Sequence, residues 1–131
     1  WARVARARQK TAEALRLVQM TTHLETKEQA RVALDVVASA LVRRVTPSEA
    51  KDMLAQLPSE LRERWLDLPT GPDRAVTRQS IVKELAQRLD VHSDAADEIA
   101  QSVGLALSAL ISEGELDDLR RQLPKGLREL F

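Results

Sequence analysis

The chain has 131 residues, with 20 basic and 20 acidic side chains and no cysteine. A formal net charge of zero excludes a long-range attraction of the whole molecule to nucleic acid or to an anionic membrane. The lack of cysteine excludes disulfides and thiolate metal sites, and it fits a reducing compartment. The longest uncharged run, residues 99–112, is shorter than the roughly 20 residues that cross a bilayer. We expect a cytoplasmic protein with no membrane span.

Alanine- and leucine-rich stretches with helical spacing predict four helices before residue 69. The first covers residues 2–20. The second follows Thr26, which has capping-box spacing to Gln29, and runs to about residue 44. A short third helix starts at Thr46, Pro47 and Glu49 and is ended by Pro58. The fourth carries apolar side chains at near four-residue spacing: Leu57, Leu61, Trp65 and Leu68.

Two prolines and one glycine make residues 68–73 the clearest linker, and further helices are predicted after it. A fifth helix follows Thr77, and Ser93 is expected to cap the sixth. Gly104 lies inside that sixth helix, where it costs about 1 kcal/mol relative to alanine, so we expect close packing there. A seventh helix begins at a capping box and ends at Pro124, and one last turn follows.

The most specific signal is an internal repeat at an offset of 66 residues. Residues 49–65 and 115–131 share Gln-Leu-Pro, then Leu-Arg-Glu, then a terminal aromatic residue in register. The preceding helices align as well, and so do the capping boxes Thr46/Glu49 and Ser112/Glu115. The repeated structural motif consists of Gln56, Leu57, Pro58, Leu61 and Trp65, and of Gln122, Leu123, Pro124, Leu127 and Phe131.

These signals predict an all-α fold of two tandem four-helix repeats, each long-long-short-short, packed with pseudo-twofold symmetry into one bundle-like domain. We expect a basic arm or helix extension over residues 1–14, a first repeat over 15–68, a linker over 69–76 and a second repeat over 77–131. Each repeat alone is too small to be more than marginally stable, so the two apolar faces should pack together. The expected core is Leu34, Val37, Leu41, Leu57, Leu61, Trp65, Val103, Leu107, Leu123, Leu127 and Phe131.

The repeated pattern resembles the domain of unknown function 2267 family. The resemblance rests on the block from Thr46 to Leu61 and its copy from Ser112 to Leu127, and it covers about residues 15–131. It implies a bacterial, helical protein built of two such halves. It implies no reaction, cofactor or catalytic residue.

Candidate chemistry is sparse. His23 and His92 lie in predicted turns at positions that the repeat does not relate, so we expect solvated turn residues rather than a catalytic base. His92 with nearby carboxylates is the best local metal set, yet no second histidine joins it. The acidic residues 113–118 lack the glycine-centred loop of a calcium site. We therefore expect no enzyme and no catalytic, cofactor-binding or metal-binding residue.

Two features remain as candidate contacts. The Gln-Leu-Pro block is interpreted as structural, with Gln56 and Gln122 satisfying carbonyls freed where each helix breaks. Residues 1–20 carry a local charge of +4, and the basic side chains of the arm are candidate contacts for an anion or nucleic acid: Arg3, Arg6, Arg8 and Lys10. Three of these, Arg3, Arg6 and Lys10, fall on one helical stripe.

The first functional hypothesis is a non-enzymatic module that acts through protein–protein association, above all with itself as a homo-oligomer. Trp1, Val4 and Leu15 are the residues through which the arm would self-associate. The alternative is binding of nucleic acid or another anionic ligand through the arginine-rich arm. The simplest interpretation of that arm is a frayed, solvated terminus that binds nothing.

Overall fold

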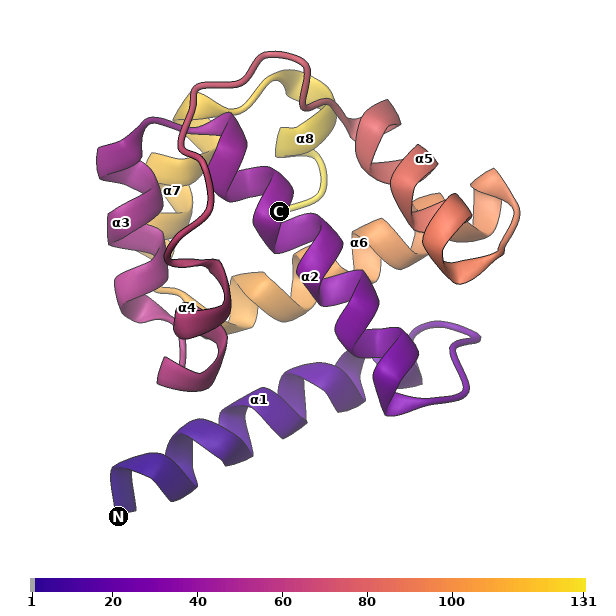
Figure 1. Ribbon diagram of the computed structural model, residues 1–131, viewed down its shortest axis with the longest axis horizontal. Coiled ribbons are helices and arrows are strands. Elements are labelled where there is room, and N and C mark those ends of the chain that lie inside the picture. Colours follow the sequence, from indigo (N-terminus) through magenta and orange to yellow (C-terminus); the bar gives the residue numbers. More distant parts are fainter. Residues whose placement is uncertain (1) are drawn as a thin grey trace.

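The computed structural model describes residues 2–131, and over that range it holds eight helices and no strand, which confirms the all-helical prediction (Figure 1). In chain order the helices are α1 (Ala2–Met20), α2 (Lys27–Arg44), α3 (Pro47–Gln56), α4 (Ser59–Trp65), α5 (Arg78–Leu89), α6 (Ser93–Leu110), α7 (Glu113–Gln122) and α8 (Lys125–Arg128). No helix within residues 2–131 combines the length and the apolar character needed to cross a membrane.

Local side-chain caps set most of the helix starts. The predicted capping box of α2 is complete: Gln29 N–H donates to Thr26 Oγ1, and Thr26 N–H donates to Gln29 Oε1, both at 3.1 Å. The prediction that Ser93 caps α6 is wrong. His92 keeps an extended backbone and its Nδ1 accepts a hydrogen bond from Asp94 N–H at 3.2 Å, so Ser93 is already the first helical residue.

Helix α2 lies at the centre of the molecule and contacts α1, α3, α4, α5 and α6. Half of its 18 residues are buried, and most are alanine or valine, which allow neighbouring helices to approach closely. Helix α6 crosses behind it in Figure 1 and forms the second buried layer, with α1 and α5 packed on it. The core is therefore filled by closely packed aliphatic side chains and not by stacked aromatic rings.

The predicted core is confirmed for ten of its eleven residues, which are all less than 5% exposed. The exception is Phe131, which is only half-buried. Leu130, one residue earlier, is buried instead, and its backbone lies against Gly104 of α6. A Cβ atom at position 104 would overlap the carbonyl oxygen of Leu130, so the expected close packing at this glycine is confirmed.

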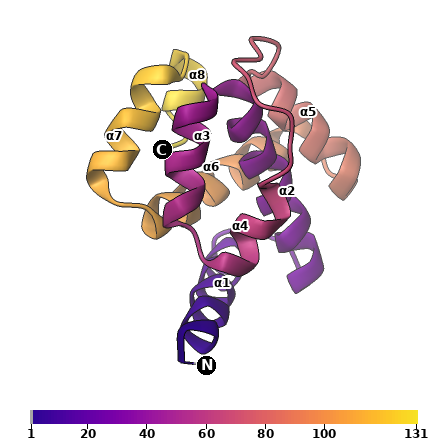
Figure 2. The ribbon, with the colours of Figure 1, turned by 60° about the vertical axis from the view of Figure 1, so that its left-hand side comes forward.

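The segment between α4 and α5 runs across α2 without helical structure. Asp73 N–H donates to the backbone oxygen of Arg43 at 2.8 Å, which ties this segment to the last turn of α2. Helices α3 and α7 lie side by side at one end of the molecule (Figure 2). The two helices that the repeat aligns therefore meet at that end, and α1 projects from the opposite side of α4.

Candidate functional site

A basic groove separates the first three turns of α1 from the turn that joins α3 to α4. Its volume is about 410 Å³. Four cationic side chains line it, together with neutral and apolar residues. The cations are Arg3, Arg6 and Lys10 of α1 and Arg62 of α4, and the other lining residues are Ala7, Gln56, Leu57, Pro58 and Ser59.

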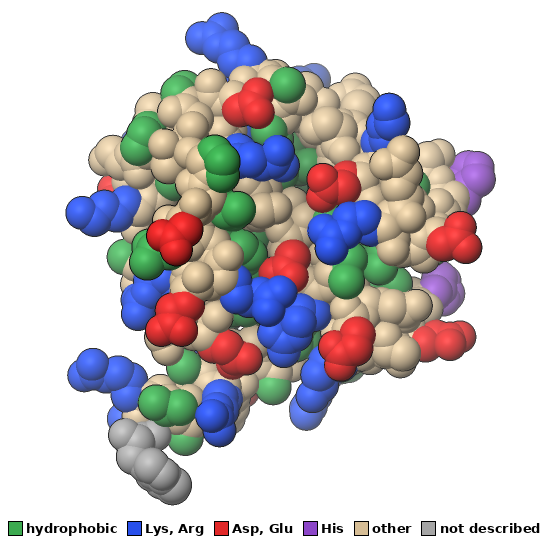
Figure 3. Space-filling model, viewed as in Figure 1, with side chains coloured by type: hydrophobic (Ala, Val, Ile, Leu, Met, Phe, Trp, Pro, Cys, Tyr) green, Lys and Arg blue, Asp and Glu red, His purple; other side chains and the backbone are tan. Residues whose placement is uncertain are grey.

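The shape of α1 explains why these cations are available. Its buried residues, Thr11, Ala14, Leu15 and Val18, all lie in the second half of the helix. The first half has no buried side chain, and it projects from the body at the lower left of Figure 1. Lys and Arg side chains surround this projection in Figure 3. The second half of α1 is therefore packed against the protein, and the first half extends from it into solvent.

Within residues 2–131, none of the four groove cations makes an ion pair or a side-chain hydrogen bond. The neighbouring arginines of the same surface behave differently, because Arg31 pairs with Glu60 and Arg64 pairs with Asp35. No acidic side chain lines the groove. The positive charge here is therefore not neutralised by the protein itself.

The structure brings together three of the four basic residues that the sequence singles out. Arg8 is exposed on α1 but does not line the groove, because it lies on another side of the helix. Sequence reasoning missed Arg62, which comes from a helix more than 50 residues away. Its only local signal is a position four residues after Pro58, in the repeated block.

The two glutamines of the Gln-Leu-Pro blocks form reciprocal contacts between α3 and α7. Gln122 Oε1 accepts a hydrogen bond from Thr46 N–H at 3.0 Å, and Gln56 Oε1 accepts one from Ser112 N–H at 2.7 Å. Thr46 and Ser112 are the N-cap residues of α3 and α7. The expectation that these glutamines satisfy freed carbonyls is thus corrected, since each caps the start of the other helix with its own carbonyl oxygen.

This exchange leaves the predicted capping boxes of α3 and α7 half complete. The hydroxyl groups of Thr46 and Ser112 accept from the N–H groups of Glu49 and Glu115, as predicted. The return bond from each glutamate is missing, because the glutamine has already occupied the N–H group of the cap. The two carboxyl groups instead meet each other where α3 packs on α7.

Burial and this contact change the acidity of Glu49. The residue is 6% exposed, and this burial, together with the neighbouring carboxyl group of Glu115 and its charge, raises the pKa of Glu49 to about 8. Asp118 and Asp52 raise the pKa further in the same direction. The Oε1 atoms of Glu49 and Glu115 are both buried without a hydrogen-bond partner among the described residues.

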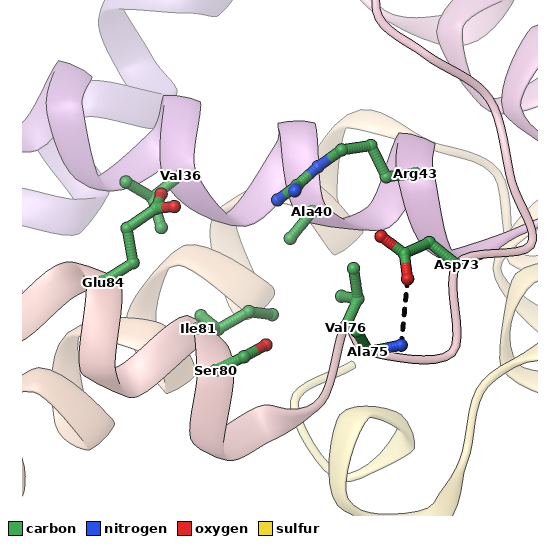
Figure 4. A pocket seen from close by; sticks show the side chains of 9 residues that line it. All are labelled: Val36, Ala40, Arg43, Asp73, Ala75, Val76, Ser80, Ile81 and Glu84. Carbon is green, nitrogen blue, oxygen red and sulfur yellow. Dashed lines mark hydrogen bonds between the residues drawn. The ribbon is translucent and has the colours of Figure 1, made fainter.

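A second, smaller cavity of about 140 Å³ lies between α2, α5 and the segment before α5 (Figure 4). Its charged lining is mixed: Arg43 and Asp73 lie at one end of the cavity, and Glu84 lies at the other. Asp73 Oδ1 accepts a hydrogen bond from Ala75 N–H at 2.9 Å. This hydrogen bond holds the segment in place beside α2.

The local metal set of the sequence is dispersed in the structure. His92 caps α6 with an exposed ring, and Asp97 instead pairs with Arg78 at 2.8 Å. Arg78 lowers the pKa of Asp97 by hydrogen bonding to its carboxylate. Over residues 2–131, no three histidine, aspartate or glutamate side chains converge in a way that could hold a metal ion.

Comparison with known proteins adds the family to these observations. None of the curated proteins compared with the chain matches it. One family model matches residues 11–130, which is nearly the whole chain and includes both Gln-Leu-Pro blocks. The chain therefore belongs to the family of uncharacterized conserved proteins known as DUF2267.

Proposed function

We propose that this chain is a non-enzymatic binding module that holds the phosphate backbone of a nucleic acid in the basic groove. The observation that carries the proposal is the set of four cations around one groove that, over residues 2–131, have no ion pair and no acidic side chain beside them in the lining. Arginine and lysine are the side chains that most often contact phosphate. The zero net charge of the whole molecule means that attraction comes from this face and not from the protein as a whole.

The arrangement of the cations favours a polymer over a single small phosphate compound. Arg3, Arg6 and Lys10 lie on successive turns of α1, so they extend over about 10 Å along the helix axis. All three are exposed, and none makes a side-chain hydrogen bond within residues 2–131. A row of exposed cations suits the regular charges of a backbone, whereas small phosphates are held by converging, fixed donors.

The number of cations sets the expected salt dependence. If all four contact phosphates, the slope of log K against log salt concentration is about −3.6 on duplex DNA and about −2.8 on a single strand. Affinity for a duplex then falls by about two orders of magnitude between about 50 and about 200 mM salt. Contacts of this kind give weak, sequence-independent binding at physiological ionic strength.

Fluorescence anisotropy with labelled duplex DNA, single-stranded DNA and RNA tests the proposal over this range of salt. The triple variant Arg3→Gln, Arg6→Gln and Lys10→Gln should abolish binding at low salt. Arg8→Gln is the matched control, since it removes one charge from the same helix outside the groove. Absence of binding by the wild-type protein at low salt would refute the proposal, and so would equal losses for Arg8→Gln and Arg6→Gln.

Self-association is the second candidate, and exposed apolar side chains on α1 and elsewhere on the surface support it. Val4 is 51% exposed, while Met20, Leu66 and Leu105 are exposed by 58% or more. Leu15, which the sequence assigns to the same surface, is instead 1% exposed and lies in the core of its own chain. Trp1 lies outside the described residues. Light scattering decides this candidate: a strictly monomeric mass at the highest soluble concentration removes it.

We also propose that residues 15–68 and 77–131 are two copies of one unit related by pseudo-twofold symmetry. The equal lengths of α2 and α6 and of α3 and α7, at a constant offset of 66 residues, support this proposal. So do the reciprocal bonds of Gln56 and Gln122. The first helices of the two units are less alike, since α5 has 12 residues and α1 has 19. Superposition of α2–α3 on α6–α7 in a crystal structure, by a rotation near half a turn, is the test.

A further inference from the structure

The packing of α3 on α7 buries two carboxyl groups against each other. Glu49 and Glu115 occupy the same position in their helices, three residues after the N-cap. Glu49 is buried and Glu115 half-buried, and the Oε1 atom of each is buried without a hydrogen-bond partner among the described residues. The two carboxyl groups act on each other where α3 packs on α7. Two ionised carboxylates in this position would repel each other, and neither could donate a hydrogen bond to the other.

The surrounding protein supplies no cation to neutralise the pair. The other acidic groups that act on Glu49 are Asp52 on α3 and Asp118 on α7. Helices α2 and α4 also pack on α3. On α4, Glu60 and Arg64 pair with side chains of α2, and Arg44 at the end of α2 has no ion pair within residues 2–131. Protonation of one carboxyl group is therefore what relieves the repulsion.

We propose that Glu49 and Glu115 share one proton at neutral pH, and that this proton clasps α7 to α3 until alkaline pH removes it. Loss of the proton leaves two negative charges in contact in a poorly solvated position, which weakens the packing of α7 on α3. The pair thus makes the closure of the fold sensitive to pH. This inference does not depend on what the basic groove binds.

The direction of the pH dependence follows from the linkage between proton binding and folding. The pKa of Glu49 is 4.5 in the unfolded chain and about 8 in the folded one. Between these values the folded state holds one more proton than the unfolded state, so stability falls as pH rises. The full stabilisation is present below the lower pKa and is lost once the pH exceeds the higher one. One proton corresponds to about a tenfold change in the unfolding equilibrium constant per pH unit.

Denaturant unfolding at a series of pH values between about 5 and about 9 measures this slope. The wild-type protein should lose up to about tenfold in its folding constant per pH unit below about pH 8. In Glu49→Gln and Glu115→Gln, the amide N–H donates to the remaining carboxylate without a shared proton, so the slope should flatten. Glu113→Gln is the matched control, because it removes an exposed carboxylate from the first turn of α7. Equal slopes in Glu49→Gln and Glu113→Gln would overturn the proposal.

Infrared spectroscopy of the wild-type protein gives a second readout that needs no variant to fold. A protonated carboxyl group absorbs apart from ionised ones, so its band reports directly on the proposed proton. The band should be present at about pH 6.5 and absent above about pH 9. Absence of the band at the lower pH would show that both groups are ionised, which contradicts the proposal.

Discussion

The basic groove and the α3–α7 contact both gather like charges, yet the two regions handle them in opposite ways. In the groove, Arg3, Arg6 and Lys10 are exposed, so water screens their mutual repulsion. At the α3–α7 contact, Glu49 is 6% exposed and a proton replaces the missing counter-charge. The first region should therefore respond to salt and the second to pH.

Truncation of the core beneath the α3–α7 contact should have the largest effect on stability. Leu123, the C-cap residue of α7, is 3% exposed. Leu123→Ala should lower the free energy of unfolding by about 2–5 kcal/mol, because it removes buried apolar volume and leaves a cavity. Denaturant unfolding at one fixed pH measures the loss.

Leu105→Ala is the control for this truncation, because Leu105 is 60% exposed on α6. Its free energy of unfolding should stay within about 0.5 kcal/mol of the wild-type value. Nucleic-acid binding at low salt should survive Leu123→Ala in the folded population, since Leu123 does not line the groove. Similar losses of stability in both variants would place the core elsewhere.

Removal of the exchanged caps should have an intermediate and unequal effect. Gln122→Ala leaves the N–H group of Thr46 without its partner in a partly buried position, which should cost about 1–3 kcal/mol. Gln56→Ala should cost less than about 1 kcal/mol, because Ser112 is exposed and water can replace the amide. Unfolding measurements on the two variants compare them directly. Equal costs would mean that burial does not decide the strength of these caps.

Removal of one groove cation should have the smallest effect on stability and a specific effect on binding. Arg62→Gln should leave the free energy of unfolding within about 0.5 kcal/mol, since Arg62 makes no ion pair within residues 2–131. It should make the salt slope of nucleic-acid binding less negative by about one. Binding titrations at several salt concentrations measure that slope, and Arg8→Gln should leave it unchanged. An unchanged slope for Arg62→Gln would remove Arg62 from the binding surface.

Local signals were sufficient to predict the helices and most of the core. The predicted bounds of α1 and α2 agree with the structure. The cap Thr26 begins α2 and the break at Pro58 follows α3, and both signals act within one turn of the chain. The start of α6 was missed because His92 is rarely an N-cap residue. Phe131 was misplaced because apolar type does not say which of two adjacent terminal residues faces inward.

Contacts between distant segments were beyond the sequence. The repeat aligns Gln56 with Gln122 and Glu49 with Glu115. An alignment does not indicate that each glutamine bonds the N-cap residue of the other repeat, or that the two glutamates lie close together. The capping-box pattern even predicts a different partner for each glutamate, within its own helix. Part of the groove could be predicted, because the basic residues on α1 recur at helical spacing. Arg62 could not be predicted, because only the packing of α1 on α4 brings it to the groove.

The exchange of caps between α3 and α7 makes the two ends of the chain depend on each other. A protease that cuts the exposed stretch at Pro69 and Thr70 would release two fragments, each lacking the acceptor for one of its helix starts. Mixing the two fragments would return each missing acceptor to its helix start. The exchange thus gives the two halves of this polypeptide a reason to reassociate after cleavage.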